Sequence, residues 1–206
     1  MSDLTLELVH RDQLEAVVDG MLRVYAAAFA APPYNHRPEG AARFKDVLMA
    51  RHAPLEGFRC LVARVGGSIV AFTYGTTTRP GNWWHDAISP ALGHEARDRW
   101  LRDAFALAEL AVEPGRQGQG IGSALHDAVL AGVSHETAVA QVRADARALR
   151  FYERHGWHKL ISGFLHRGSR HPVVIIGLAL GCAPQANSLL VDSDADRARQ
   201  GVGDVD

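Results

Sequence analysis

Four glycines crowd into residues 115–122, between an apolar run at 105–112 and a segment at 120–133 with helical hydrophobic spacing. The apolar run predicts a buried strand, and the spacing that follows predicts an amphipathic helix. Glycine lets a backbone approach a ligand closely, and the first turn of a helix offers unpaired N–H groups at its positive end. This strand, loop and helix are typical of a site for a phosphate-type anion.

Two familiar phosphate-binding patterns do not match this loop. A Walker A loop ends in Gly-Lys-Ser/Thr, whereas Ile121 follows Gly120 here. A dinucleotide fingerprint requires Gly-x-Gly-x-x-Gly, and Gly118, Gly120 and Gly122 fall one residue short of it. A tight turn without a ligand stays open as an alternative. Arg116 would add a charge-assisted contact to a bound anion.

The rest of the sequence predicts strands and helices in alternation. Strands are expected at 4–8, 58–65, 68–78, 105–112, 137–143, 157–166 and 172–180, and helices at 11–30, 39–51, 120–133 and 145–154. Asp145 is the expected N-cap of the last helix, and Gly156 is expected to close it. This order predicts one α/β domain over residues 1–182, with a mixed sheet and helices on both faces.

Two segments stand outside this pattern. Residues 82–104 form an insertion, in which Ser89-Pro90 is expected to begin a helix. That helix would place on one face Leu92, Ala96, Trp100 and Ala104. Trp83-Trp84 either packs the insertion or lines an acceptor pocket or a dimer contact. Residues 183–206 are polar and rich in aspartate, and we expect a flexible tail there.

Composition and charge bear on the partners, the compartment and the metal content that we expect. The chain of 206 residues has a formal net charge of -1, so it carries no bulk field that attracts nucleic acid or an anionic membrane. The apolar run at 173–180 is too short to span a bilayer, and the first residues do not resemble a secretory signal. Two cysteines far apart in sequence suggest reduced thiols, and we expect a cytoplasmic protein. The eleven histidines lack metal-ligand spacing, so no metal site is predicted.

Two blocks resemble one protein family. Gln117-Gly118-Gln119-Gly120-Ile121-Gly122 fits the Gln/Arg-x-x-Gly-x-Gly/Ala signature of the GCN5-related N-acetyltransferases, which holds the pyrophosphate of acetyl-CoA. Ala148-Leu149-Arg150-Phe151-Tyr152-Glu153-Arg154-His155-Gly156-Trp157 is similar to the family's Ala-x-x-Phe-Tyr-x-x-x-Gly-Phe block. The order of elements agrees as well, and the resemblance implies the family's mixed, splayed central sheet.

The resemblance also implies roles for individual residues. Tyr152 would be the general acid that protonates the thiolate of CoA, with Phe151 anchoring its helix in the core. The residues implied to hold acetyl-CoA are Leu110, Ala111, Val112, Arg116, Gln117, Gly118, Gln119, Gly120, Ile121, Gly122, Ser123 and Asp145. The family often has Asn at the position of Asp145. Relatives that acetylate protein N-termini tend to have Glu where Gln141 stands, and a glutamine cannot act as a base.

Glu109 is the best candidate for a general base, acting directly or through water. It is the one acid in the apolar run at 105–112, where partial desolvation would raise its pKa. An anchor for the substrate ammonium and a structural ion pair remain alternatives for this side chain.

Together these features predict an acetyl-CoA-dependent N-acetyltransferase that acts on the primary amine of a small molecule. A peptide or protein amine as acceptor stays open, and so does a homodimer. From a different class, a non-catalytic acyl-CoA-binding regulatory module would use the same loop. Release of free thiol from acetyl-CoA with a panel of amines separates the enzyme from the module.

Overall fold

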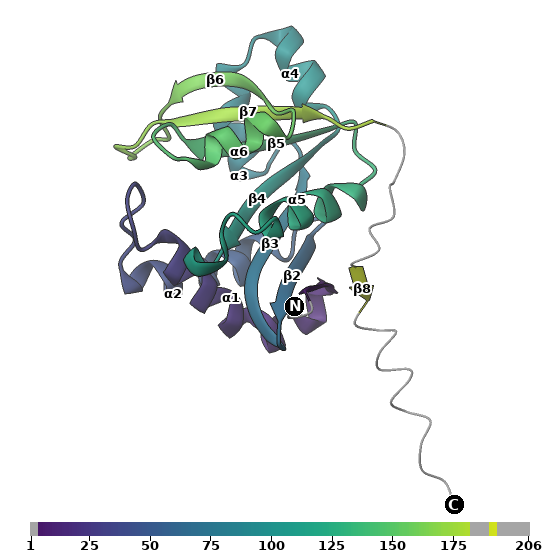
Figure 1. The fold of residues 1–206 in the computed structure, drawn as a ribbon. Coiled ribbons are helices and arrows are strands. Elements are labelled where there is room, and N and C mark those ends of the chain that lie inside the picture. Colours follow the sequence, from purple (N-terminus) through teal and green to yellow (C-terminus); the bar gives the residue numbers. More distant parts are fainter. Residues whose placement is uncertain (1–3, 182–189, 193–206) are drawn as a thin grey trace, which may run out of the picture.

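An eight-stranded sheet runs through the part of the chain that the computed structural model describes, residues 4–181 and 190–192 (Figure 1). In chain order the strands are β1 (Leu4–Val9), β2 (Arg59–Val65), β3 (Ser68–Thr78), β4 (Ala104–Val112), β5 (Thr137–Arg143), β6 (His158–Phe164), β7 (Val173–Ala179) and β8 (Leu190–Asp192). Their order across the sheet is β6-β7-β5-β4-β3-β2-β1-β8. Neighbours are antiparallel except for the β4–β5 and β1–β8 pairs, which are parallel.

Helices cover both faces of the sheet, as predicted from the alternation of elements. They are α1 (Leu14–Phe29), α2 (Pro38–Val47), α3 (Trp83–Ile88), α4 (His94–Leu101), α5 (Ile121–Ala131) and α6 (Ala148–Arg154). Short turns of 3-10 helix lie at Arg11–Gln13, Ser89–Ala91 and Pro114–Arg116, and a π-helical turn spans Leu48–His52. One core lies under α5 and α6, a second lies under α1 and α2, and α3 and α4 cover a third with β5 and β7. No helix in these ranges is long and apolar enough to cross a membrane.

The predicted helix from Ser89 was wrong. The insertion instead holds two separate helices, α3 and α4. The 3-10 turn that begins at Ser89 ends at Leu92, which is extended with φ -90° and ψ 136°, and Gly93 is the N-cap of α4. The side chains assigned to one helical face still meet: Leu92, Trp100 and Ala104 are buried in one cluster, against which Ala96 packs. Most of the predicted tail lies outside the described residues, although Leu190–Asp192 pairs with β1.

The start of α6 also differs from the prediction. Arg147, not Asp145, occupies the N-cap position, and Asp145 binds Arg143 through two hydrogen bonds of 2.9 and 2.7 Å. A guanidinium two residues away outcompetes the backbone N–H groups for this carboxylate. The prediction that Gly156 closes α6 is confirmed. Gly156 has φ 81°, and the N–H of Trp157 donates to the carbonyl of Tyr152 at 3.1 Å, as in a Schellman motif.

A β-bulge in β4 decides which side chains face which helices. Tyr74 pairs with Glu109 and Gly75 pairs with Leu107, so Ala108 is one residue more than β3 can match. Before the bulge, Phe105 and Leu107 point into the core under α5. After it, Leu110 and Val112 do so, while Ala111 packs with α1 and α2. The extra residue therefore turns Glu109 away from α5 and toward the α1–α2 face.

The sheet opens between β4 and β5. The two strands pair only where Ala104–Ala106 meets Thr137–Val139. Beyond that point β4 stays bonded to β3 as far as Val112, while β5 stays bonded to β7 as far as Arg143. Because each strand follows a different neighbour, they diverge like the arms of a V (Figure 1). The facing edges of β4 and β5 are left without strand partners within the V.

Gly75 lies opposite the bulge, where the chain leaves no room for a side chain. A Cβ there would come within 2.4 Å of the Phe105 ring and 2.5 Å of the Ala106 carbonyl oxygen. We expect Gly75→Ala to lower the free energy of unfolding by about 1–3 kcal/mol, because the backbone at the bulge must shift. Chemical denaturation measures this loss. Gly181→Ala, with open space around its Cβ, is the control and should change little; equal stability of both variants would contradict the prediction.

Candidate active site

The glycine-rich loop leads from the end of β4 into α5. Gly118 and Gly120 have φ values of +76° and +82°, a region that L side chains rarely adopt, and Gly120 is the N-cap of α5. A Cβ at either glycine would meet nothing within 4 Å, so the loop surface is open. The glycines are therefore required for backbone conformation and leave the amides accessible to a ligand.

Two glutamine side chains brace this loop from within. Gln117 Nε2 donates to the carbonyl of Val112, and Gln119 Nε2 donates to the carbonyl of Gly115, both at 3.1 Å. The N–H groups of the first turn of α5 have no intrahelical acceptors and lie at the positive end of the helix dipole. This pre-shaped row of donors suits a diphosphate.

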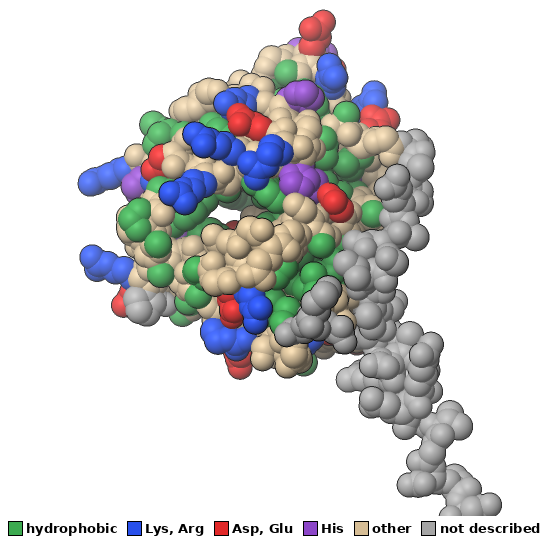
Figure 2. All heavy atoms as spheres, in the orientation of Figure 1, with side chains coloured by type: hydrophobic (Ala, Val, Ile, Leu, Met, Phe, Trp, Pro, Cys, Tyr) green, Lys and Arg blue, Asp and Glu red, His purple; other side chains and the backbone are tan. Residues whose placement is uncertain are grey.

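The face that holds this loop is hollowed, with hydrophobic side chains at the hollow and several Lys and Arg side chains beside it (Figure 2). On α6 and just before it, the arginines at 147, 150 and 154 are exposed. Arg116, in the loop itself, is partly exposed. The positive charge on this side complements an anionic ligand.

His155 connects the end of α6 to the first turn of α5, a contact that the sequence analysis missed. Its Nδ1 lies 2.8 Å from the carbonyl oxygen of Phe151, which can only accept, so Nδ1 carries the proton. In the neutral ring Nε2 then accepts from the Ser123 hydroxyl at 3.1 Å. Ser123, an expected ligand-binding residue, is thereby held in place. No local motif marks His155, because its partner is far away in sequence.

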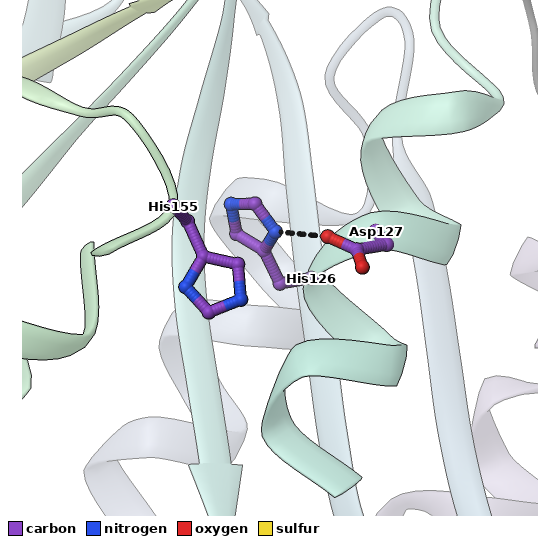
Figure 3. A group of neighbouring side chains, drawn as sticks. All are labelled: His126, Asp127 and His155. Atoms are coloured by element: carbon purple, nitrogen blue, oxygen red, sulfur yellow. Dashed lines mark hydrogen bonds and ion pairs between the residues drawn. The ribbon is translucent and has the colours of Figure 1, made fainter. Parts of the chain in front are cut away.

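His126, Asp127 and His155 lie close enough together for a metal ion, with one ligand atom of each within 4.8 Å of the others (Figure 3). The hydrogen bonds around His126 speak against that use. Trp157 Nε1, a donor only, reaches His126 Nε2 at 2.9 Å, so the proton of His126 sits on Nδ1 and is shared with Asp127 at 2.8 Å. Both ring nitrogens of His126 are committed, and the cluster is a structural network that joins α5 to Trp157.

A cavity lies between β4 and the α1–α2 region, on the face of the sheet opposite to α5. Its volume is about 630 Å³, and the residues that line it are Tyr25, Asn35, His36, Arg37, Gly40, Arg43, Phe44, Val47, His52, Tyr74, Ala108, Glu109 and Gln141. Glu109 comes from the bulge of β4 and is its only acidic lining residue. Burial raises the pKa of Glu109 to about 8, although a backbone N–H opposes the shift. This carboxyl group can exchange a proton near neutral pH.

Gln141 reaches the same cavity from β5 and is held by the insertion. Its Oε1 accepts from Trp84 Nε1 at 3.0 Å and lies 2.6 Å from His166 Nε2. Trp83, which is 67% exposed, stacks on the His166 ring with centroids 5.2 Å apart. The two tryptophans, whose roles the sequence left undecided, thus have different contacts. Trp84 positions Gln141, and Trp83 covers His166, which also binds Gln141.

Tyr152 is placed more deeply than expected. It is 8% exposed and packs edge-on against Trp157, whereas its neighbour Phe151 is only partly buried and lies against Gly122. The prediction that Phe151 anchors the helix is confirmed, because its side chain packs against the core under α5 and α6. Tyr152, expected to stand free of that core, is itself buried, since the α6 face that carries it meets Trp157. Burial raises the pKa of Tyr152, and the charge of Glu109 raises it further. The phenol is therefore protonated at neutral pH and within electrostatic reach of Glu109.

The structure brings most of the expected site residues to the open part of the sheet. Leu110, Ala111 and Val112 form the edge of β4 within the V, and the loop through Ser123 continues from it. Asp145 is exposed and hydrogen-bonded to Arg143, and this guanidinium holds the pKa of Asp145 below its ordinary range. The cavity walls from α1 and α2 were not predicted, since nothing in those segments marks them as neighbours of Glu109.

Comparison with known proteins agrees with this geometry. A family model described as the acetyltransferase (GNAT) domain matches residues 56–159. The GCN5-like protein acetyltransferase Rv2170 of Mycobacterium tuberculosis is 30% identical over 121 residues, which cover 54% of this chain and 59% of that protein. The chain thus spans less than two thirds of that relative.

Solved structures show the same fold. A GNAT-family protein from Desulfovibrio desulfuricans superposes with a TM-score of 0.60 at 18% identity, covering 87% of this chain and 100% of that one. The protein yncA of Salmonella typhimurium, solved with its cofactor acetyl-CoA, gives a TM-score of 0.53 at 14% identity and covers 91% of this chain and 99% of that one.

Glu109 makes stability depend on pH. An ordinary glutamate titrates near 4.5, and the folded protein raises this pKa to about 8, so ionisation opposes folding. Relative to wild type, Glu109→Gln should gain stability as pH rises from about 4.5 to about 8 and gain no more above that range. Melting temperatures across this pH range measure the gain. Glu136→Gln, at an exposed ion pair with Arg102, is the control; a pH-independent difference for Glu109→Gln would refute the assignment.

Proposed function

Because this chain belongs to the GNAT acetyltransferase family, we propose that it transfers the acetyl group of acetyl-CoA to the primary amine of a small molecule. One observation carries this proposal: Glu109 lies where the cavity lined by α1 and α2 meets the open V between β4 and β5. A volume of about 630 Å³ falls in the range of small-ligand sites. We assign the whole activity to one domain, residues 1–182.

The residues present fit acetyl-CoA as co-substrate. The diphosphate would accept hydrogen bonds from the amides at 118–123, beside Arg116. The pantetheine arm would run along Leu110, Ala111 and Val112, where β4 has lost its β5 partner and its backbone groups on that edge are available. Acetyl-CoA supplies the acetyl group as a thioester.

Glu109 and Tyr152 would handle the two protons of the reaction. A neutral acceptor nitrogen forms the new C–N bond to the carbonyl carbon, and the C–S bond breaks with its electron pair on sulfur. Glu109 takes the proton released by the acceptor amine, directly or through water. Tyr152 gives its proton to the departing sulfur and is reprotonated from solvent, so atoms and charge balance.

A peptide or protein amine is the second candidate, because the relative from Mycobacterium tuberculosis is named a protein acetyltransferase. Thiol release from acetyl-CoA, measured with small amines and with peptides, decides between them. Turnover of small amines supports the proposal. Turnover of peptides alone would show that the acceptor is a peptide or protein amine. Tight CoA binding without any turnover would indicate a non-catalytic module.

Gly120 tests the cofactor loop. Valine at its φ of +82° is strained by about 1–2 kcal/mol and would distort the amides that precede α5. We expect Gly120→Val to abolish binding of CoA, measured by isothermal titration calorimetry, with the circular dichroism spectrum unchanged. Gly66→Val carries a similar strain at φ +57° in the remote β2–β3 hairpin and should bind CoA normally. Normal CoA affinity in Gly120→Val would exclude this loop.

Tyr152 tests the proton donor. Tyr152→Phe keeps the ring and its packing against Trp157 and removes only the hydroxyl. Loss of general acid catalysis should lower the rate of acetyl transfer by about 10²–10⁴-fold. Single-turnover measurements isolate this step from product release, and CoA affinity and melting temperature serve as controls. A nearly normal single-turnover rate would remove Tyr152 from the mechanism.

A further inference from the structure

The cavity beside Glu109 carries positive charge that nothing in the described structure neutralises. Arg37, just before α2, and Arg43, on α2, both line it and are exposed. Neither guanidinium group forms an ion pair or a side-chain hydrogen bond within residues 4–181 and 190–192. By contrast, Arg143 at the nearby end of β5 is paired with Asp145 at 2.7 Å. The two cavity arginines are therefore available to a ligand.

The other ionisable lining residues do not offset this charge. Glu109, with a pKa near 8, is mostly protonated at neutral pH. Burial lowers the pKa of both His36 and His52, so these rings are neutral there. Their Nδ1 atoms are hydrogen-bonded to the phenols of Tyr25 and Tyr74 at 3.1 and 3.0 Å. The residues that line the cavity thus include two permanent cations, Arg37 and Arg43, and no permanent anion at neutral pH.

Gln141 adds a donor with a fixed direction. The indole N–H of Trp84 can only donate, so the atom of Gln141 that it meets must be Oε1. His166 donates to the same oxygen, at 2.6 Å from Nε2. Because Oε1 already accepts two hydrogen bonds, Gln141 presents its amide NH₂ to the cavity. This NH₂ group can donate to an oxygen of a bound ligand.

The walls between these polar groups are aromatic and aliphatic. Tyr25 stacks on Phe44 with ring centroids 4.2 Å apart, and Val47 and Tyr74 also line the cavity. An occupant therefore meets a carboxyl group at β4, apolar rings along α1 and α2, and cationic and amide donors elsewhere.

We propose that the acceptor is an amine that also carries a carboxylate, namely a free α-amino acid with an apolar side chain. Its amine lies at Glu109, and its carboxylate binds Arg37 and Arg43, which suit the planar, bidentate geometry of carboxylates. The Gln141 amide donates to an oxygen of the same acceptor. This inference rests on the proposed function and narrows its acceptor.

Matched acceptors test it directly. Phenylalanine, its methyl ester, its amide and phenethylamine share the ring and a primary amine but differ in the carboxylate. With acetyl-CoA and wild-type enzyme, kcat/KM should be at least about tenfold higher for phenylalanine than for the other three. Leucine and isopentylamine provide a second pair without an aromatic ring.

Arginine variants locate the effect. Arg37→Ala and Arg43→Ala should each lower kcat/KM for phenylalanine about tenfold or more, mainly through KM, and leave phenethylamine within about twofold. Arg43→Lys should recover part of the loss because it keeps the charge. Arg99→Ala, on the exposed side of α4, is the matched control and should leave both acceptors unchanged.

The outcomes separate this inference from the proposed function. Turnover of phenethylamine or the amide as fast as phenylalanine, or arginine variants that slow all acceptors alike, would overturn the inference and leave the acetyltransferase standing. Absence of turnover with every amine, while CoA still binds, would overturn both.

Discussion

The active-site geometry depends on the hydrogen bonding of a single strand. β4 is bonded to β3 along its whole length, but it is bonded to β5 only over Ala104–Ala106. A strand that gives up one neighbour leaves backbone donors and acceptors free, and in a protein interior such groups require other partners. The open edge therefore has unpaired backbone groups, and these are the groups that we propose bind the pantetheine arm of acetyl-CoA.

The bulge at Ala108 makes the same strand serve two sites. Without the extra residue, Glu109 would share a face with Phe105 and Leu107 and would point into the core beneath α5. With it, the carboxyl group enters the cavity on the α1–α2 side. The Thr73 hydroxyl donates to the Glu109 carbonyl at 2.9 Å, and the space around Gly75 is filled by Phe105, so the packing on both sides keeps the irregular backbone in place.

Contacts between α5 and the end of α6 connect the glycine-rich loop to the proposed proton donor. His155 holds Ser123 in the first turn of α5, and Trp157 donates to His126 one turn further along that helix. Tyr152 packs between the same aromatic groups, 5.3 Å from Trp157 and 6.4 Å from His126 between centroids. A shift of α5 would therefore be felt at Tyr152, since these rings are closely packed.

The sequence by itself determined the features that depend on neighbouring residues. The glycine spacing specified the loop, hydrophobic periodicity specified most strands and helices, and an acid within an apolar strand singled out Glu109. The apolar positions 105, 107, 110 and 112 even contain the change of register that the bulge produces. Here local backbone preferences and side-chain alternation suffice, because both act over a few residues.

Only the tertiary structure decided which distant side chains meet. It placed Arg37 and Arg43 in the lining of the cavity that Glu109 enters, let Trp84 fix Gln141, and joined His155 to Ser123. It also gave Asp145 to Arg143 in place of a helix cap, a competition that turns on the conformation of the chain after β5. Such pairings follow from how strands diverge and helices dock, and the sequence pattern of any one segment contains no information about the segment it will face.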